Sequence, residues 1–237
     1  MEYIVIIVIS LISLICLAII YDLRISNIKK IKSLGFSKEL NEITNKLPEN
    51  KVVCEEILKI LHNNNVKVVE DKNKNAKASL YIVATNTISI ANIKDSCTRI
   101  QTIAHECIHS IQNKRILMFN FIYSNIYIVY FFVICVLTFF GKIKNPMIQV
   151  YTLTLLSFIY YKIRSFLETD AMTRAPYLAN KYMKENEILD NNEIEKIMNT
   201  YKEINNTGIK IVNLQFFTKC IAKIIIYCIM CLILVNN

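Results

Sequence analysis

Long apolar segments are the feature that most limits how this chain of 237 residues can fold. Residues 3–21 form a run of 19 apolar or weakly polar residues without a charge, which is long enough to cross a bilayer as one helix. Three further runs cover residues 116–140, 147–161 and 216–235. The last of them contains Lys219 and Lys223, so it predicts either a further span or a helix at the membrane interface. We therefore expect a multi-pass protein of the cell membrane with three to four transmembrane helices and the lipid bilayer as a partner.

Basic residues beside these runs predict the orientation of the chain. The first run is followed by four of them, Arg24, Lys29, Lys30 and Lys32. Because such residues favour the cytoplasmic side, residues 1–21 are expected to be an anchor whose N-terminus lies outside. Residues 116–161 are expected to form a transmembrane hairpin that returns the chain to the side on which it began. The polar segments 22–115 and 162–215 would then both lie in the cytoplasm, and 216–237 would form the last transmembrane or interfacial helix.

The two polar segments predict an α+β fold that is mostly helical with a short β-sheet. Apolar residues recur at helical spacing in residues 37–47, 49–61 and 95–114. Runs of β-branched residues predict short strands over residues 66–70, 80–84 and 87–91. We expect Asp95 or Ser96 to cap the helix 95–114. Polar side chains are expected to keep this helix out of hydrocarbon, namely Arg99, Gln101, Gln112 and Lys114.

Composition disfavours several classes of function. The three glycines, Gly35, Gly141 and Gly208, are too far apart for the glycine-rich loops that bind nucleotides. The net charge is +9, but no basic patch interleaved with aromatic residues occurs, so we expect no nucleic-acid partner. The cysteines follow no disulfide pattern, and we interpret the pair Cys228 and Cys231, inside an apolar run, as packing residues. The spans contain few polar residues, which disfavours a transporter.

Residues 102–112, with the sequence TIAHECIHSIQ, contain the pattern His-Glu-x-x-His. On a helix, His105 and His109 lie on one face, one turn apart, and their ring nitrogens can bind one metal ion. Glu106 stands beside the first ligand, where a carboxylate can act as a general base toward water. The pattern therefore predicts a zinc site, and the alternative is a pair of histidines on an ordinary amphipathic helix.

Two histidines leave Zn²⁺ short of a protein ligand. His62 is the remaining histidine, but it follows a predicted helix, where a cation is favoured without any metal. Glu168, in the segment FLETDAMTRA, is the better third ligand because the predicted hairpin returns it to the side of His105. Two histidines, one glutamate and an open position form a set that zinc hydrolases use. The alternative for Glu168 and Asp170 is a solvated pair beside the membrane.

These features together resemble the bacterial membrane zinc metallopeptidases of the YugP type, a family of neutral zinc metallopeptidases among the gluzincins. AHECIHSIQ is similar to the AHEvGHaiQ segment of that family, and LETDAMTRA is similar to its VEFxASxRA helix. The resemblance covers about residues 50–180 and extends more distantly to the HtpX and CAAX-prenyl proteases. The family has a glycine before the second histidine, where this chain has Ile108.

The resemblance implies a zincin-like domain with Zn²⁺ held by His105, His109 and Glu168, and with Glu106 as the base. Asp170 would orient a ligand imidazole, and Arg174 would be a nearby cation. The segment NTISIAN is similar to the strand that lines the substrate cleft of gluzincins, so a peptide is expected to add to an edge formed by Thr87, Ile88, Ser89 and Ile90.

The expected function is that of a membrane-anchored zinc endopeptidase that hydrolyses protein or peptide substrates at the cytoplasmic membrane face. The alternative from another class is a catalytically inactive scaffold or chaperone-like protein that keeps the metalloprotease fold. The sequence carries no indication of an oligomeric state.

Overall fold

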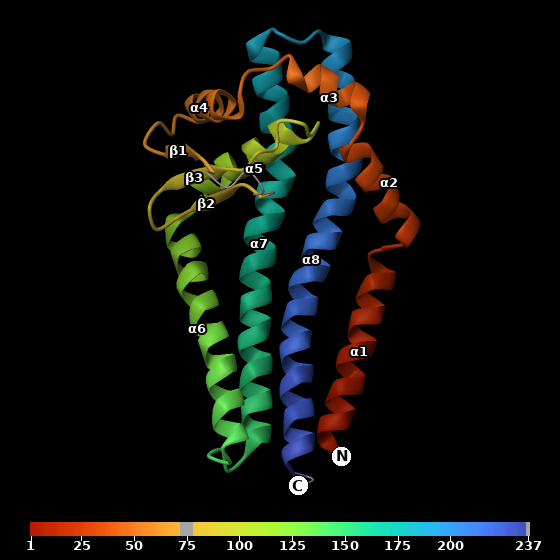
Figure 1. The fold of residues 1–237 in the computed structure, drawn as a ribbon, viewed down its shortest axis with the longest axis vertical. Coiled ribbons are helices and arrows are strands. Elements are labelled where there is room, and N and C mark those ends of the chain that lie inside the picture. The colour runs from red at the N-terminus through yellow and green to blue at the C-terminus, as the bar shows by residue number, and fades with distance from the viewer. Residues whose placement is uncertain (72–77, 236–237) are drawn as a thin grey trace. The chain divides into compact units, whose positions relative to one another are not determined.

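The computed structural model describes residues 1–71 and 78–235 and is mostly helical, with one small sheet (Figure 1). The chain divides into two compact units. We call residues 1–23, 119–166 and 210 onward the apolar unit, and residues 24–118 and 167–209 the mixed unit. The elements, in chain order, are α1 (Glu2–Ile20), α2 (Ile25–Gly35), α3 (Lys38–Asn45), α4 (Asn50–Ile60), β1 (Lys67–Glu70), β2 (Leu80–Ile82), β3 (Thr87–Ile90), α5 (Arg99–Ile111), α6 (Lys114–Phe139), α7 (Pro146–Asn186) and α8 (Asn191–Val235).

Three helices of the described chain, α1, α6 and α8, are long and apolar enough to cross a membrane. This agrees with the expectation of a membrane protein with at least three spans. The run 147–161 forms the first part of α7, which is not among these three helices. One face of α7 is nevertheless apolar and exposed, through Ile148, Tyr151, Leu155 and Phe158. Polar side chains on the inner face, among them Gln149 and Ser157, lower the hydropathy of the run.

The apolar unit has its own core, in which α6, α7 and α8 pack together with residues of α1 at the edge. Hydroxyl groups inside this core bond to one another, as in the pair Tyr127 Oη and Ser157 Oγ at 2.6 Å. Cys228 and Cys231 are fully buried in the same core as free thiols. They are packing residues, as the sequence predicts.

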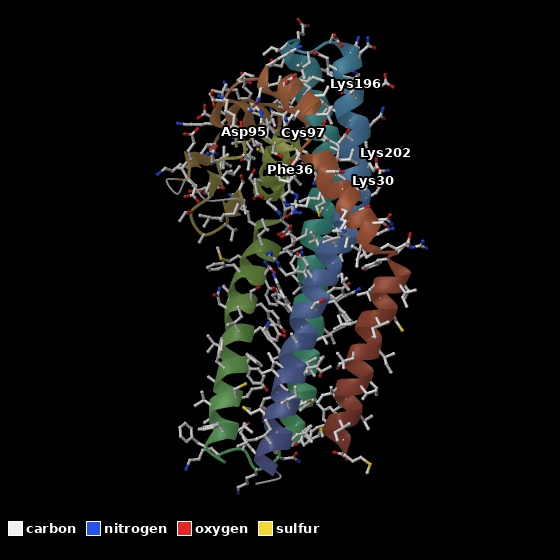
Figure 2. The ribbon with its side chains drawn as sticks, turned by 45° about the vertical axis from the view of Figure 1, so that its right-hand side comes forward. Lys30, Phe36, Asp95, Cys97, Lys196 and Lys202 are labelled. Carbon is white, nitrogen blue, oxygen red and sulfur yellow. The ribbon has the colours of Figure 1, made fainter. Side chains whose placement is uncertain are left out.

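α7 and α8 continue without a break through residues 161 and 215, where the composition changes from apolar to polar or back. The limits predicted for the apolar and polar segments therefore do not coincide with helix ends. The C-terminal part of α7 and the N-terminal part of α8 belong to the mixed unit. There α8 is joined to α2 and α3 by ion pairs of Lys30 with Glu203 and of Lys196 with Glu39. Figure 2 labels Lys30 on α2 and Lys196 on α8.

The sheet of the mixed unit has the strand order β1-β3-β2, with β3 parallel to β1 and antiparallel to β2. The predicted strands are confirmed, but the edge assigned to Thr87–Ile90 is wrong, because these residues form the central strand. Their main chain pairs with Lys67–Glu70 on one side and with Leu80–Ile82 on the other. A run of β-branched residues predicts a strand but does not show its neighbours in the sheet. No peptide can add beside β3.

α5 packs against α4, β2 and β3 and begins at Arg99, after Thr98. The cap predicted at Asp95 or Ser96 is therefore wrong. The reason is a turn before the helix, in which the Ser96 hydroxyl bonds the Thr98 hydroxyl at 2.8 Å and the Ser96 carbonyl accepts from the Arg99 amide at 3.0 Å.

Arg99 does not lie on the surface of α5 as a polar side chain facing water. It is completely buried, and its guanidinium donates to the carbonyls of Thr44, Leu47 and Pro48 and to Asn50 Oδ1, at 2.7–2.9 Å. These acceptors lie where α3 ends and α4 begins. The bonds join carbonyls in and after the last turn of α3 to Arg99, and they hold the first turn of α5 in place.

Candidate metal centre

The two histidines of the pattern meet on α5. His105 and His109 lie four residues apart, and their Nε2 atoms are 3.0 Å from each other. The two rings stand edge to face, with centroids 4.6 Å apart. Two successive turns of α5 thus present two imidazole nitrogens at a single point, as the spacing of the histidines predicts.

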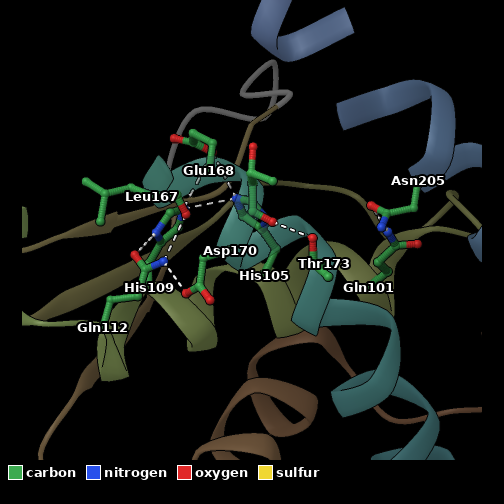
Figure 3. Close-up of polar contacts among 10 residues, drawn as sticks. Gln101, His105, His109, Gln112, Leu167, Glu168, Asp170, Thr173 and Asn205 are labelled. Atoms are coloured by element: carbon green, nitrogen blue, oxygen red, sulfur yellow. Dashed lines mark hydrogen bonds and ion pairs between the residues drawn. The ribbon is translucent and has the colours of Figure 1, made fainter. Parts of the chain in front are cut away.

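Glu168, on α7, reaches the same point from a different part of the chain (Figure 3). Its Oε2 lies 3.3 Å from His105 Nε2 and 3.6 Å from His109 Nε2. Among the described residues, these three form the group of side chains that could hold a metal ion. His62 is not part of it and lies after α4, with a positive φ of 54°.

The three donor atoms have the spacing that a tetrahedral ion requires. Zn²⁺ binds imidazole nitrogen and carboxylate oxygen at about 2.0–2.1 Å, so two ligands of a tetrahedral site are roughly 3.3 Å apart. The separations of 3.0, 3.3 and 3.6 Å bracket this value. Imidazole nitrogen is a common ligand of zinc, whereas Ca²⁺ and Mg²⁺ take mostly oxygen ligands. A set of two nitrogen donors and one oxygen donor therefore suits zinc better. The residues present therefore fit the ion that the sequence predicts.

Gln112 orients the second histidine, and sequence reasoning missed this role. Its Oε1 accepts from His109 Nδ1 at 2.8 Å, while its Nε2 donates to the Leu167 carbonyl at 2.9 Å and to Asp170 Oδ2 at 2.7 Å (Figure 3). The side chain is buried. Because Nδ1 carries the proton in this bond, Nε2 keeps its lone pair for a metal. The position of Gln112 three residues after His109 is the signal that could have identified it.

Asp170 and Arg174 both lie beside the site, but Asp170 does not contact an imidazole as the resemblance implies. Asp170 bonds Gln112 rather than an imidazole, so it supports His109 through one intervening side chain. Arg174 lies 3.5 Å from Asp170, through its Nη1, on the exposed side of that carboxylate. Arg174, Asp170 and Gln112 are thus linked by polar contacts that run from the surface to His109.

Glu106 is buried between α5 and the sheet. Burial raises the pKa of its carboxyl group, and the charge of Glu168 acts in the same direction. The imidazoles of His105 and His109 oppose this rise, as does a hydrogen bond from the Tyr81 main chain. The Glu106 carboxylate therefore lies next to β2, and its pKa is raised in the direction that suits a group that accepts and returns a proton.

The carboxylates of Glu168 and Glu106 act on the pKa of the His109 imidazole. Burial alone lowers the pKa of this imidazole, but the hydrogen bond and charge of Glu168, together with the charge of Glu106, outweigh it and raise the pKa. Two carboxylates thus act on one histidine. Such a negative surrounding favours a cation at this point, whether a proton or a metal ion.

Comparisons of the chain with models of protein families, with curated proteins and with solved structures found no match.

Proposed function

We propose that this protein is a membrane-bound, zinc-dependent peptidase. The convergence of His105 and His109 with Glu168 carries the proposal, because the three donor atoms come from segments about 60 residues apart and have tetrahedral spacing. The buried Glu106 beside them adds the group that hydrolysis needs. The resemblance to the YugP-type metallopeptidases supports the same reading of the residues.

Each residue has a defined part in the proposed reaction. Bound Zn²⁺ would act as a Lewis acid toward the scissile carbonyl and would make water acidic enough to ionise near neutral pH. The Glu106 carboxylate accepts the proton of the attacking water and donates it to the leaving amine. His105, His109 and Glu168 hold the ion, and Gln112 keeps the His109 ring in one tautomer.

We propose that the peptide substrate binds beside β2 and not beside β3. Among the described strands β2 pairs only with β3, so we assign its other edge to an extended peptide. The main chain of Tyr81, in the middle of β2, bonds Glu106. A peptide that adds to this edge would bring its own main chain close to the proposed base.

The proposed location is the cytoplasmic face of the membrane. Its support is the set of basic residues that follows the first apolar run. Glu168 also follows the apolar stretch of α7 after only a few residues, which favours a site near the bilayer surface.

The test is cleavage of a peptide library by the purified full-length protein and its Glu106→Gln variant. The variant should bind zinc as the original protein does and lose at least about a hundredfold in cleavage rate, the order of magnitude of general base catalysis. Glu185→Gln, an exposed change on α7, is the matched control and should cleave normally. A protein that binds zinc but cleaves no peptide would support an inactive scaffold, and equal cleavage by the Glu106 variant would refute the assigned base.

A further inference from the structure

The apolar unit contains a group of cations that the proposed peptidase reaction does not use. Residues 119–166 and 210–235, which form most of this unit, include no aspartate or glutamate. Lys219 and Lys223 nevertheless lie on α8 within the stretch identified as able to cross a membrane. A charge in hydrocarbon costs free energy and usually has a partner. The groups around the two lysines therefore indicate what they bind.

Aromatic rings from three helices surround these cations. Lys223 Nζ lies 4.7 Å from the ring centre of Tyr127 on α6 and 5.9 Å from that of Tyr160 on α7. Lys219 Nζ lies 5.9 Å from the ring centre of Phe216, which also carries the Arg164 guanidinium at 5.2 Å. We call Lys219 and Lys223, with the rings of Tyr127, Tyr160 and Phe216, the cationic cluster. Ring faces attract cations but leave their charge uncompensated.

The two lysines belong together within the cluster. Lys223 Nζ donates to the Lys219 carbonyl at 3.4 Å, so its side chain extends one turn back along α8. Lys223 is half-buried and Lys219 is exposed. Neither forms an ion pair with a carboxylate in the part of the chain that the structure describes. Their ammonium groups are thus available to an anion from outside the protein.

The depth of the cluster matches the headgroup region of a bilayer. α7 starts at Pro146 beside the link from α6, and at about 1.5 Å per residue its length from there to Tyr160 is roughly 21 Å and to Arg164 roughly 27 Å. The hydrocarbon layer is about 30 Å thick. Tyr160 belongs to the cluster and Arg164 contacts its Phe216 ring, so the cluster occupies the part of this layer that is close to the membrane boundary farther from the link. Lysine side chains that extend toward a boundary are typical of such positions.

The outer face of α8 provides the apolar part of the same site. Ile226, Ile229 and Ile233 are exposed, and they follow Lys219 at intervals of seven, ten and fourteen residues. These intervals place them on one face of the helix, directly below Lys219. An acyl chain can lie along this face while its phosphate meets the ammonium group at the top.

We propose that the cationic cluster binds the phosphate of an anionic phospholipid, with an acyl chain along Ile226, Ile229 and Ile233. The two lysines supply the charge, and the aromatic rings hold Lys223 in place. The lipid would be a resident partner of α6, α7 and α8. This inference does not depend on the metal centre.

The test measures binding of phosphatidylglycerol to the purified full-length protein in a nonionic detergent, by native mass spectrometry over a range of lipid concentrations. Lys219→Met and Lys223→Met should each weaken binding about fivefold, the change that corresponds to one basic residue near an anionic surface. Lys144→Met is the matched control, since Lys144 is an exposed lysine on the link at the opposite end of the unit, and it should bind as the original protein does. Lys219 is exposed, so its variant is informative even where Lys223→Met fails to fold.

Two further binding measurements identify the ligand. Phosphatidylcholine should bind at least fivefold more weakly than phosphatidylglycerol, and inorganic phosphate should not compete at equal concentration. Equal binding of the two lipids would overturn the proposal, as would displacement of the lipid by inorganic phosphate. Unchanged binding of phosphatidylglycerol by both lysine variants would also overturn it and would leave the lysines as simple membrane anchors.

Discussion

Replacement of Gln112 by leucine should weaken zinc binding without removing any metal ligand. The side chain makes three hydrogen bonds, to His109 Nδ1 at 2.8 Å, to the Leu167 carbonyl at 2.9 Å and to Asp170 Oδ2 at 2.7 Å. Leucine has a similar size but can form none of them. The His109 ring then loses the bond that fixes its orientation and tautomer.

The expected magnitude follows from the position of Gln112 behind a ligand. Removal of a side chain that supports a metal-bound histidine lowers metal affinity about 10- to 100-fold, or roughly 1.4–2.7 kcal/mol. Asp170→Asn should have a smaller effect, because Asp170 reaches His109 only through Gln112 and an asparagine oxygen can still accept from Gln112 Nε2.

The assay is a zinc titration of the purified protein in detergent against a chromophoric chelator. Gln101→Leu is the matched control, since Gln101 also lies on α5 but bonds Asn205 Oδ1 at 3.2 Å, away from the ligands (Figure 3). Zinc affinity should be unchanged in this control. An affinity of Gln112→Leu within twofold of the original protein, with the fold intact, would refute the reasoning that the bond to Nδ1 positions His109.

Three other predictions concern pH, stability and substrate. The raised pKa values of Glu106 and His109 mean that the folded protein binds protons more tightly than the unfolded chain, so the metal-free protein should lose thermal stability as pH rises over roughly 5 to 8. Glu106→Gln should reduce this loss of stability. The stabilisation by added zinc should grow over the same pH range. A melting temperature of the metal-free protein that rises with pH would contradict the direction of both pKa shifts. Arg99→Met should lower the free energy of unfolding in urea by about 3 kcal/mol or more, because four acceptors, three of them buried, lose this donor, and a loss under 1 kcal/mol would contradict this role. Peptides methylated at alternate main-chain nitrogens should compete about tenfold less well for cleavage than unmodified peptides, because a peptide N–H can no longer donate to the Tyr81 carbonyl at the edge of β2, and equal competition would rule out strand addition.

The parts of the site that lie close in sequence could be predicted from local spacing. His105 and His109 are one helical turn apart, so any helix at this point brings them together. Glu168 was predicted from the order of apolar and polar segments, and the structure places it within 3.6 Å of both imidazoles. The apolar runs likewise predict the helices α1, α6 and α8, because length and lack of charge are sufficient for that inference.

The errors have a common physical cause, namely that sequence patterns do not show which groups meet in space. Residues 87–90 have the composition of a strand, but only the pairing with β1 and β2 makes β3 central. Arg99 is polar by type, which predicts only that its helix lies outside hydrocarbon, yet carbonyls at and after the end of α3 accept its hydrogen bonds inside the core. Asp170 is near the ligands, but Gln112 lies between it and His109.

Metal content measured by elemental analysis of the purified protein tests the central claim most directly. The original protein and Glu106→Gln should each retain one zinc ion per chain after dialysis, because Glu106 is not a ligand. His109→Ala and Glu168→Ala should retain much less than one. Absence of zinc from the original protein, or full zinc content in both ligand variants, would contradict the proposed metal centre and with it the assignment as a peptidase.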